Sequence, residues 1–293
     1  MSIGNISGKR SCLITEKERS NMKKGYFSLC KWVACITMLI SHLGAVLKPY
    51  VDEWIWVVTN TIGRVAFPLF VFLMIEAFYY TKSRPKHLLR IGIIALVSEV
   101  PFDLLTAGTP INYRYQNVCF TLFLGFLMLV IIHSSAYAKF VLSVKRLLKT
   151  HLNTKTDKIG SFVSSVITLL IWCTFMFTAY LSCCDYGWFG IFLIGVLDFA
   201  RRAKKKKTFI CIGIAAFAIL NKNPVYAICV VDAFMIIYAW CANTCTDYRK
   251  TESKKNEMNK PLNNFSVWFF RAFYPVHLLV LGLLNITLPL FIK

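Results

Sequence analysis

Nine apolar stretches follow one another along this chain, and its basic residues fall almost entirely in every second gap between them. The chain has 293 residues, of which 57 % are hydrophobic, and it carries 34 Lys and Arg against 14 Asp and Glu. A soluble protein would spread this charge over its whole surface, whereas a polytopic membrane protein concentrates it in the loops of one side. We therefore predict an all-α fold, a polytopic integral membrane helical bundle.

The nine stretches are each long enough, or nearly long enough, to cross a hydrocarbon core of ~30 Å as a helix. The first, sixth and seventh are short for a span. The second is long, which is consistent with a surface segment up to Ile62 followed by a span from Arg64. The predicted spans are Trp32–Leu47, Trp54–Tyr80, Leu88–Thr106, Asn117–Ala138, Ile159–Leu181, Asp185–Ala200, Thr208–Leu220, Pro224–Ala242 and Phe265–Leu290.

The distribution of the 34 basic residues predicts the orientation. Two of them, Arg64 and Arg271, lie inside spans, and four lie in the gaps opposite the amino-terminal tail: Lys48, Arg114, Lys222 and Lys293. The remaining 28 of the 34 lie on the side of the tail. The positive-inside rule then puts the tail in the cytoplasm and the carboxyl terminus outside. We expect a basic, disordered cytoplasmic tail over residues 1–25 and one transmembrane domain over residues 26–293.

Composition excludes several other classes. A formal net charge of +20 could indicate a nucleic-acid partner, but charge that follows the loops is explained by anionic lipid, so we expect the bilayer as partner and no nucleic acid. Residues 1–25 lack the apolar core of a secretory signal. The eleven cysteines lie mostly inside spans, without the His and Cys spacing of a zinc site. We expect no metal and no disulfide framework.

Ionisable side chains inside a bilayer are costly and usually functional. Four of them, on the first three spans, reach a similar outer depth and are predicted to line one cavity: His42, Arg64, Glu99 and Asp103. The alternative is that the carboxylates pair with Arg64 or Arg271 and lock the bundle. The other intramembrane groups are Asp232, Arg271, His277 and Glu76, of which Glu76 lies near the cytoplasmic end. Asp185 and Asp198 mark the ends of the sixth span and are expected to be in contact with water.

His42 is the sharpest candidate for a catalytic base, because an imidazole titrates near neutral pH and can take a proton from an amine or hydroxyl. Lys31 lies eleven residues earlier, about three helical turns, and so faces the same way. The alternative is a hydrogen-bonded packing residue. His277 is the second candidate, with Asp232 as its expected partner.

These residues belong to short motifs that together resemble the TraX family. The resemblance covers residues 30–285, in the family's order. The motifs are Lys31–Ala45 (KWVACITMLISHLGA), Ile62–Phe70 (IGRVAFPLF), Glu76–Thr81 (EAFYYT), Ser98–Asp103 (SEVPFD), Asn117–Leu122 (NVCFTL), Asp185–Gly187 (DYG) and Phe273–Leu278 (FYPVHL).

The resemblance implies an acetyltransferase of the bacterial cytoplasmic membrane, with acetyl-coenzyme A as donor and a pilin amine or a cell-surface glycan hydroxyl as acceptor. The chain is also similar to membrane acyltransferases in which a basic residue precedes an essential histidine by eleven positions, as Lys31 precedes His42. TraX proteins commonly have Asp before this histidine, where this chain has Ser41. The implied catalytic residues are His42, Glu99, Asp103 and Arg64, and the implied substrate-binding residues are Lys31, Asn117, Asp185, Tyr186, Arg271, Tyr274 and His277.

In the mechanism that this reading favours, His42 is the general base and Glu99 or Asp103 fixes its tautomer. Arg64 or Arg271 stabilises the thioester oxygen. The phosphates of coenzyme A meet inner basic residues, with Lys82, Arg84 and the cluster 201–207 as candidates. Two alternatives stay open: a small-solute transporter, typical of broken helices with buried charges, and a non-catalytic pilus or conjugation assembly factor. Substitution of His42 by Gln distinguishes the enzyme from both.

Overall fold

The chain folds into helices, which confirms the predicted all-α class. The computed structural model describes residues 16–152, 157–203, 206–220, 232, 236–237 and 264–291, and this part of the chain contains no β-strand. The helices are α1 (Glu16–Leu47), the short 3₁₀ turn η1 (Lys48–Tyr50), α2 (Glu53–Gly63), α3 (Ala66–Tyr80), α4 (Arg84–Ala107), α5 (Val118–Ile132), α6 (Ser135–Leu152), α7 (Asp157–Leu181), α8 (Gly187–Arg202), α9 (Lys206–Leu220) and α11 (Asn264–Phe291).

Most predicted spans coincide with one helix. The predicted eighth span, residues 224–242, lies outside the described residues except for Asp232 and the pair 236–237. Residues 1–15 of the predicted tail also lie outside them, and α1 begins at Glu16, ahead of the predicted domain boundary.

The predicted end of the fourth span at Ala138 is wrong. The helix stops at Ile132, and α6 continues from Ser135 at an angle of 50° to α5. Ser134 gives the physical reason, because its Oγ accepts the backbone N–H of Tyr137 at 3.0 Å and so caps a new helix. The apolar run is therefore divided between two helices rather than forming one long span.

The long second stretch is interrupted where the sequence suggested, between α2 and α3. Pro68 lies in the first turn of α3, where its missing N–H is tolerated. In an unbroken helix its ring would clash with the carbonyl of Arg64, and the chain leaves the helix at Arg64 and Val65. The break puts Arg64 at the junction of two helices.

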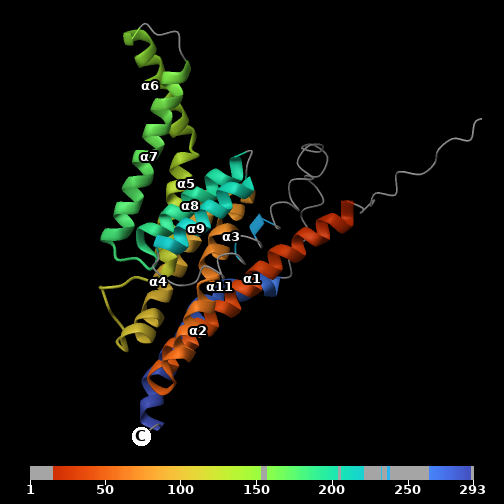
Figure 1. The fold of residues 1–293 in the computed structure, drawn as a ribbon, viewed down its shortest axis with the longest axis vertical. Coiled ribbons are helices and arrows are strands. Elements are labelled where there is room, and N and C mark those ends of the chain that lie inside the picture. The colour runs from red at the N-terminus through yellow and green to blue at the C-terminus, as the bar shows by residue number, and fades with distance from the viewer. Residues whose placement is uncertain are drawn as a thin grey trace, which may run out of the picture.

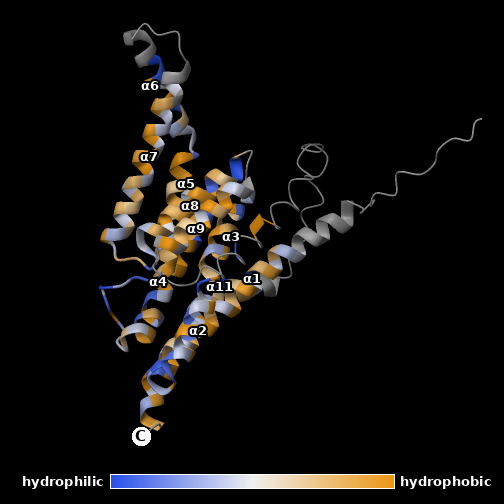
Figure 2. Ribbon diagram, viewed as in Figure 1, coloured by the Kyte–Doolittle hydropathy of each residue, from blue (hydrophilic) through white to orange (hydrophobic). Residues whose placement is uncertain are grey.

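Apolar surface and helix length make this a membrane protein. Four helical runs are long and apolar enough to cross a bilayer: 25–50, 53–80, 162–181 and 268–291; the bent pair α5–α6 makes a fifth if it counts as one span. Figure 2 shows apolar residues along these helices and hydrophilic ones in the coloured upper part of α6 and in the α4–α5 loop. The number of crossings and their orientation stay predictions.

The connections alternate between two ends of the molecule. In Figure 1 the α6–α7 and α8–α9 connections lie in the upper part, whereas the α1–α2, α4–α5 and α7–α8 connections and the carboxyl terminus lie lower. Helices α1 and α11 lie side by side and run in the same direction. This arrangement fits the predicted alternation of cytoplasmic and external loops.

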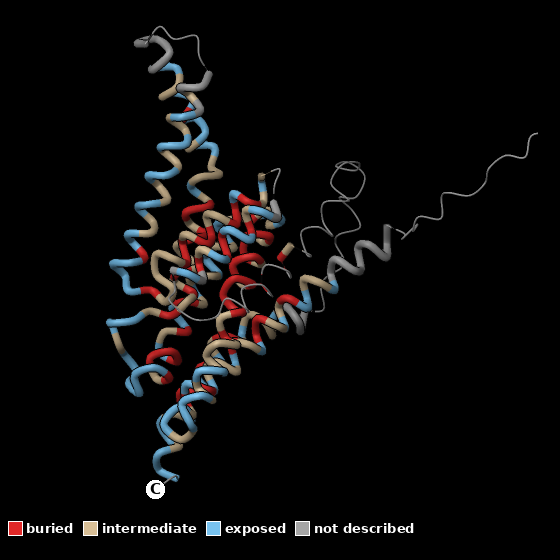
Figure 3. Tube along the Cα trace, viewed as in Figure 1, coloured by how far each residue is buried: buried red, intermediate tan, exposed pale blue. Residues whose placement is uncertain are grey.

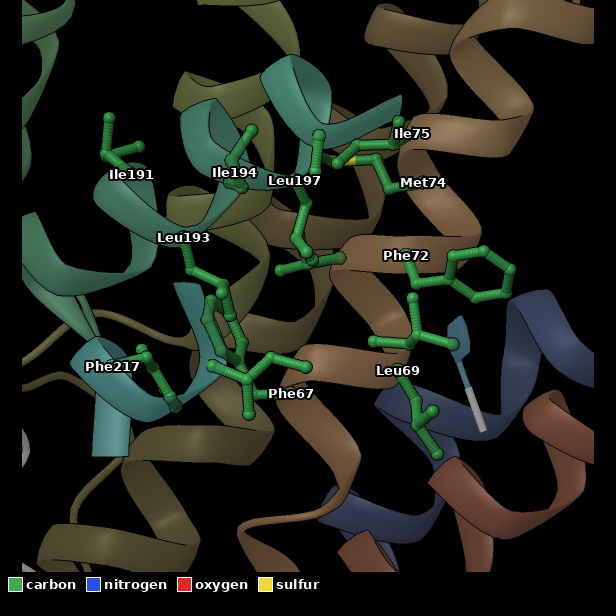
Figure 4. Close-up of a cluster of buried hydrophobic side chains, with 14 of the residues drawn as sticks. Phe67, Leu69, Phe72, Met74, Ile75, Ile191, Leu193, Ile194, Leu197 and Phe217 are labelled. Carbon is green, nitrogen blue, oxygen red and sulfur yellow. The ribbon is translucent and has the colours of Figure 1, made fainter. Parts of the chain in front are cut away.

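The core lies where α3, α5, α8 and α9 meet, and buried residues gather there in Figure 3. In Figure 4, Phe67 and Phe72 of α3 lie with Leu193 and Leu197 of α8 and Phe217 of α9. By contrast α7 is peripheral: its Phe162 and Leu170 are 69 % and 61 % exposed, as lipid-facing side chains would be. A second, smaller core joins α1, α4 and α11, and it adjoins the candidate site.

Candidate functional site

Two histidines that are 235 residues apart in the chain meet between α1 and α11. Nδ1 of His42 lies 2.9 Å from Nε2 of His277, and the two rings are nearly parallel at 7°. Toward the amino-terminal ends of the same helices, Nζ of Lys31 lies 5.6 Å from the ring centroid of Phe270. Lys31 and His42 therefore both face α11, as their spacing predicted.

The ring of His277 is enclosed on several sides. Its Nδ1 lies 2.7 Å from the carbonyl oxygen of Phe273, the ring of Phe273 stacks against it at 4.7 Å, and Tyr274 meets it edge-on at 5.7 Å. His277 is 8 % exposed. The expectation that His277 pairs with Asp232 is wrong in this structure, because the hydrogen-bond partners of His277 are His42 and a backbone carbonyl.

Small residues bring α2 close to α1 beside His42. A Cβ built on Gly63 would lie 2.2 Å from Cβ of Ser41, and one built on Gly44 would lie 2.0 Å from Oγ1 of Thr59. Close packing through Gly and Ser is the usual way for helices to associate in lipid. The contact between Ser41 and Gly63 brings the next residues along the chain, His42 and Arg64, to the same level of the bundle.

Glu99 of α4 binds the start of α5, not His42. Its Oε2 accepts hydrogen bonds from both nitrogens of Asn117, with the backbone N–H at 3.2 Å. Asn117 is fully buried; its Oδ1 caps α5 by accepting from the N–H of Cys119 at 3.0 Å, and its Nδ2 donates to the carbonyl of Ala95 at 2.8 Å. A carboxylate at a helix N-terminus is stabilising, so Glu99 and Asn117 together fix the α4–α5 junction.

Asp103 holds the loop that follows α4. Its Oδ2 accepts the backbone N–H of Asn112 at 2.7 Å, and it is 2 % exposed. The second oxygen of each carboxylate, Oε1 of Glu99 and Oδ1 of Asp103, is buried without a hydrogen-bond partner among the described residues. The expectation that Glu99 or Asp103 fixes the tautomer of His42 is therefore wrong in this structure, since His277 occupies that position.

Asp185 and Tyr186 connect the α4–α5 loop and the α7–α8 turn at one end of the bundle. Oδ1 of Asp185 accepts from Tyr115 Oη at 2.5 Å and from the N–H of Tyr186 at 2.9 Å. Burial raises the pKa of the Asp185 carboxyl, and the hydrogen bond from Tyr115 and the charge of Arg64 oppose that rise. Tyr186 has φ of 59°, uncommon for a non-glycine residue, and its ring stacks on Phe67 at 4.0 Å. These contacts hold the α7–α8 turn against the α4–α5 loop.

The two arginines inside the spans are in different surroundings. Arg64 donates from Nη2 to Asn60 at 3.4 Å and lies 5.8 Å from the ring centroid of Tyr186, while its buried Nε has no hydrogen-bond partner among the described residues. Arg271 lies 5.7 Å from the ring centroid of Trp268. Neither arginine forms an ion pair within the described ranges, so the alternative in which a carboxylate pairs with an arginine and locks the bundle is not met there.

Tyr274 completes the junction. It is 8 % exposed and packs in the second core with Val118 and Cys119, at the start of α5. Of the residues expected to act together, the structure thus brings His42, His277 and Tyr274 into one group. It assigns Glu99, Asn117 and Asp103 to the α4–α5 junction, and Arg64, Asp185 and Tyr186 to the surroundings of the α7–α8 turn.

Sequence reasoning missed a buried network at the opposite end of the bundle. Oδ1 of Asp198 accepts from Tyr79 Oη at 2.7 Å, and its Oδ2 lies 2.8 Å from Nη2 of Arg202 and 3.2 Å from Nε2 of His133. Asp198 is 3 % exposed, so the expectation that it is wet is wrong. The spacing of Asp198 and Arg202, four residues apart on one helix, was the available signal.

The same network engages Arg201. Its Nε lies 2.7 Å from Oε1 of Glu76, and its guanidinium lies over the ring of Tyr79 at 3.8 Å. Arg84 likewise lies over the ring of Phe78 at 4.2 Å. Arg201 and Arg202 were expected among the residues that meet phosphates, but both are already paired with buried carboxylates.

Taken together, the fold and the histidine pair define a helical membrane protein whose two sequence-distant histidine motifs meet inside the bundle. The family model described as TraX protein matches residues 27–285, and the chain belongs to the TraX family. No curated protein and no solved structure matches the chain. Membership supports a role connected with conjugation and pilin.

Proposed function

We propose that this protein is an acetyltransferase of the bacterial cytoplasmic membrane, with acetyl-coenzyme A as donor and an amine or hydroxyl of a pilin or surface glycan as acceptor. The observation that carries the proposal is the meeting of His42 and His277 at 2.9 Å. An imidazole held by a polar partner inside an apolar bundle is suited to proton transfer. Family membership supports the class of reaction.

In the proposed reaction, His42 takes the proton of the acceptor amine or hydroxyl as that atom attacks the carbonyl carbon of the thioester. The new bond forms to the acceptor, the carbon–sulfur bond breaks, and the thiolate leaves with the electron pair and takes up the proton. General base assistance of this kind contributes about 10²–10⁴-fold in rate.

Arg64 is the candidate for stabilising the negative charge that develops on the thioester oxygen. Its buried Nε has no hydrogen-bond partner among the described residues, and a donor already in place is effective in a water-poor site. Arg271 lies against Trp268, and Arg64 is therefore the stronger candidate.

The inner basic residues are the candidates for meeting the phosphates of acetyl-coenzyme A. Because Arg201 and Arg202 are paired with Glu76 and Asp198, the proposal assigns this role chiefly to Lys82 and to the lysines at 204–207. The side chains of these last lysines lie outside the described residues.

The experiment compares surface material from a strain that lacks the gene with material from strains that carry the wild type or His42→Gln. Mass analysis should find an acetyl group that is lost on deletion, restored by the wild type and absent with His42→Gln at equal membrane insertion. Full restoration by His42→Gln would instead support a non-catalytic assembly factor or a transporter.

A further inference from the structure

We infer that His277 is the positioning residue of this site: it accepts the hydrogen bond from Nδ1–H of His42 and so leaves Nε2 of His42 as the unprotonated nitrogen. The tautomer follows from the contacts of the two rings alone. Its consequence for the rate of acetyl transfer rests on the proposed function.

A backbone carbonyl fixes the tautomer of His277. Nδ1 of His277 lies 2.7 Å from the carbonyl oxygen of Phe273, and a carbonyl oxygen can only accept, so Nδ1 of His277 carries the proton. A neutral imidazole has one N–H, which leaves Nε2 of His277 as an acceptor. That Nε2 lies 2.9 Å from Nδ1 of His42, and therefore Nδ1 of His42 must donate.

Both rings are neutral in the resting protein under this assignment. An imidazolium inside a bilayer would need an anionic partner. In the described part of the chain, His133 forms an ion pair with Asp198, whereas neither His42 nor His277 forms an ion pair. With both rings neutral, each carries its proton on Nδ1, and Nε2 of His42 is free to accept a proton.

Packing holds this arrangement in place. The ring of Phe273 stacks on His277 at 4.7 Å, the ring of His42 lies 5.2 Å from it, and Tyr274 meets its edge. His277 thus cannot turn its Nε2 away from His42 without losing several contacts. When Nε2 of His42 takes a proton, Nδ1–H continues to donate to His277, which stabilises the imidazolium.

The residue before His42 does not take over this orienting role. It is Ser41, which has no carboxylate that could orient the imidazole. Ser41 packs against Gly63 instead, so closely that a Cβ added at Gly63 would lie 2.2 Å from Cβ of Ser41. His277, on another helix, supplies the acceptor that orients His42.

The direct test is nitrogen NMR of the full-length protein in lipid, with ¹⁵N-labelled histidine. The chain has five histidines, and the signals of His42 and His277 are assigned by their loss in His42→Gln and His277→Gln. We expect both rings as the Nδ1–H tautomer. A signal of His42 with the proton on Nε2 would overturn the inference, and this readout does not depend on any activity.

The second test separates positioning from packing by kinetics in proteoliposomes. The probe is radiolabelled acetyl-coenzyme A, with envelope material from the deletion strain as acceptor. His277→Gln keeps a polar acceptor near the position of Nε2, whereas His277→Leu has similar bulk and no polar atom. Loss of an orienting partner typically costs about 10–100-fold. We expect that loss in kcat for His277→Leu, an unchanged KM for acetyl-coenzyme A, and substantial recovery in His277→Gln.

A wild-type kcat in His277→Leu would overturn the positioning role. A wild-type protein that transfers no acetyl group would overturn the proposed function, while the NMR result would still decide the tautomer. Membrane insertion and thermal unfolding of each variant show whether a loss reflects misfolding; equal loss in His277→Gln and His277→Leu with normal unfolding would also contradict the positioning role.

Discussion

Substitution of Gly63 by Ala tests whether the close approach of α1 and α2 holds the site together. The added Cβ would lie 2.2 Å from Cβ of Ser41 and 2.4 Å from its Oγ. Carbon atoms in contact prefer a separation of about 3.5–4.0 Å, so the two helices must separate by about 1–2 Å there. Overpacking of this kind costs about 1–3 kcal/mol in free energy of unfolding.

The same displacement should reach the site, because Ser41 is adjacent to His42. Nδ1 of His42 lies 2.9 Å from Nε2 of His277, and an increase of about 1 Å in this distance would break the hydrogen bond between them. We therefore expect Gly63→Ala to lower both the thermal stability in detergent and the rate of acetyl transfer. Gly25→Ala is the matched control, since Gly25 lies in α1 with nothing within 4 Å of its added Cβ.

A second variant tests whether the clash with Ser41 causes the loss. Ser41→Gly removes both clashing atoms and leaves Cα of residue 41 at 3.4 Å from the added methyl group. The double variant Ser41→Gly/Gly63→Ala should recover most of the lost stability. The steric account is refuted if Gly63→Ala unfolds at the same temperature as Gly25→Ala, or if the double variant is no more stable than Gly63→Ala alone.

Three other predictions concern the rest of the bundle. Asp198→Ala should lower the free energy of unfolding by about 3 kcal/mol, because it leaves buried partners unpaired. Arg202→Ala removes the half-exposed partner and should cost under about 1 kcal/mol. Equal losses of the two variants in thermal unfolding would contradict the network. Asn117→Ala should cost more than the ~1 kcal/mol of a helix cap, because Glu99 and a carbonyl also lose a donor; a cost no larger than a cap would argue against the junction. Reporter fusions after Lys207 and at Lys293 should give opposite signals, and the same signal from both would refute the nine-span topology.

The sequence predicted the fold class and most helix positions because apolar length and charge segregation act locally and are strong. It also predicted the break near Arg64, because the second apolar stretch is long for a single span, and Pro68 gives the physical reason for the break. The end of the fourth span was missed because Ser134 caps a new helix inside an apolar run, and hydropathy does not record a hydroxyl that caps.

The site was harder to predict than the fold. Depth along each span placed His42, Arg64, Glu99 and Asp103 at one level, but depth says nothing about which face of a helix meets which neighbour. The structure turns Glu99 toward Asn117 and His42 toward His277. Such partners depend on the packing of α4 and α11, which one sequence does not specify.

The central claim, that His42 is the base of an acetyl transfer, is tested most directly by single-turnover transfer in proteoliposomes. The measurement is labelled acetyl moved from acetyl-coenzyme A to envelope material of the deletion strain, per unit of inserted protein. We predict transfer by the wild type and a loss of about 10²–10⁴-fold in His42→Gln, with normal thermal unfolding. Transfer at the wild-type rate by His42→Gln would contradict the account.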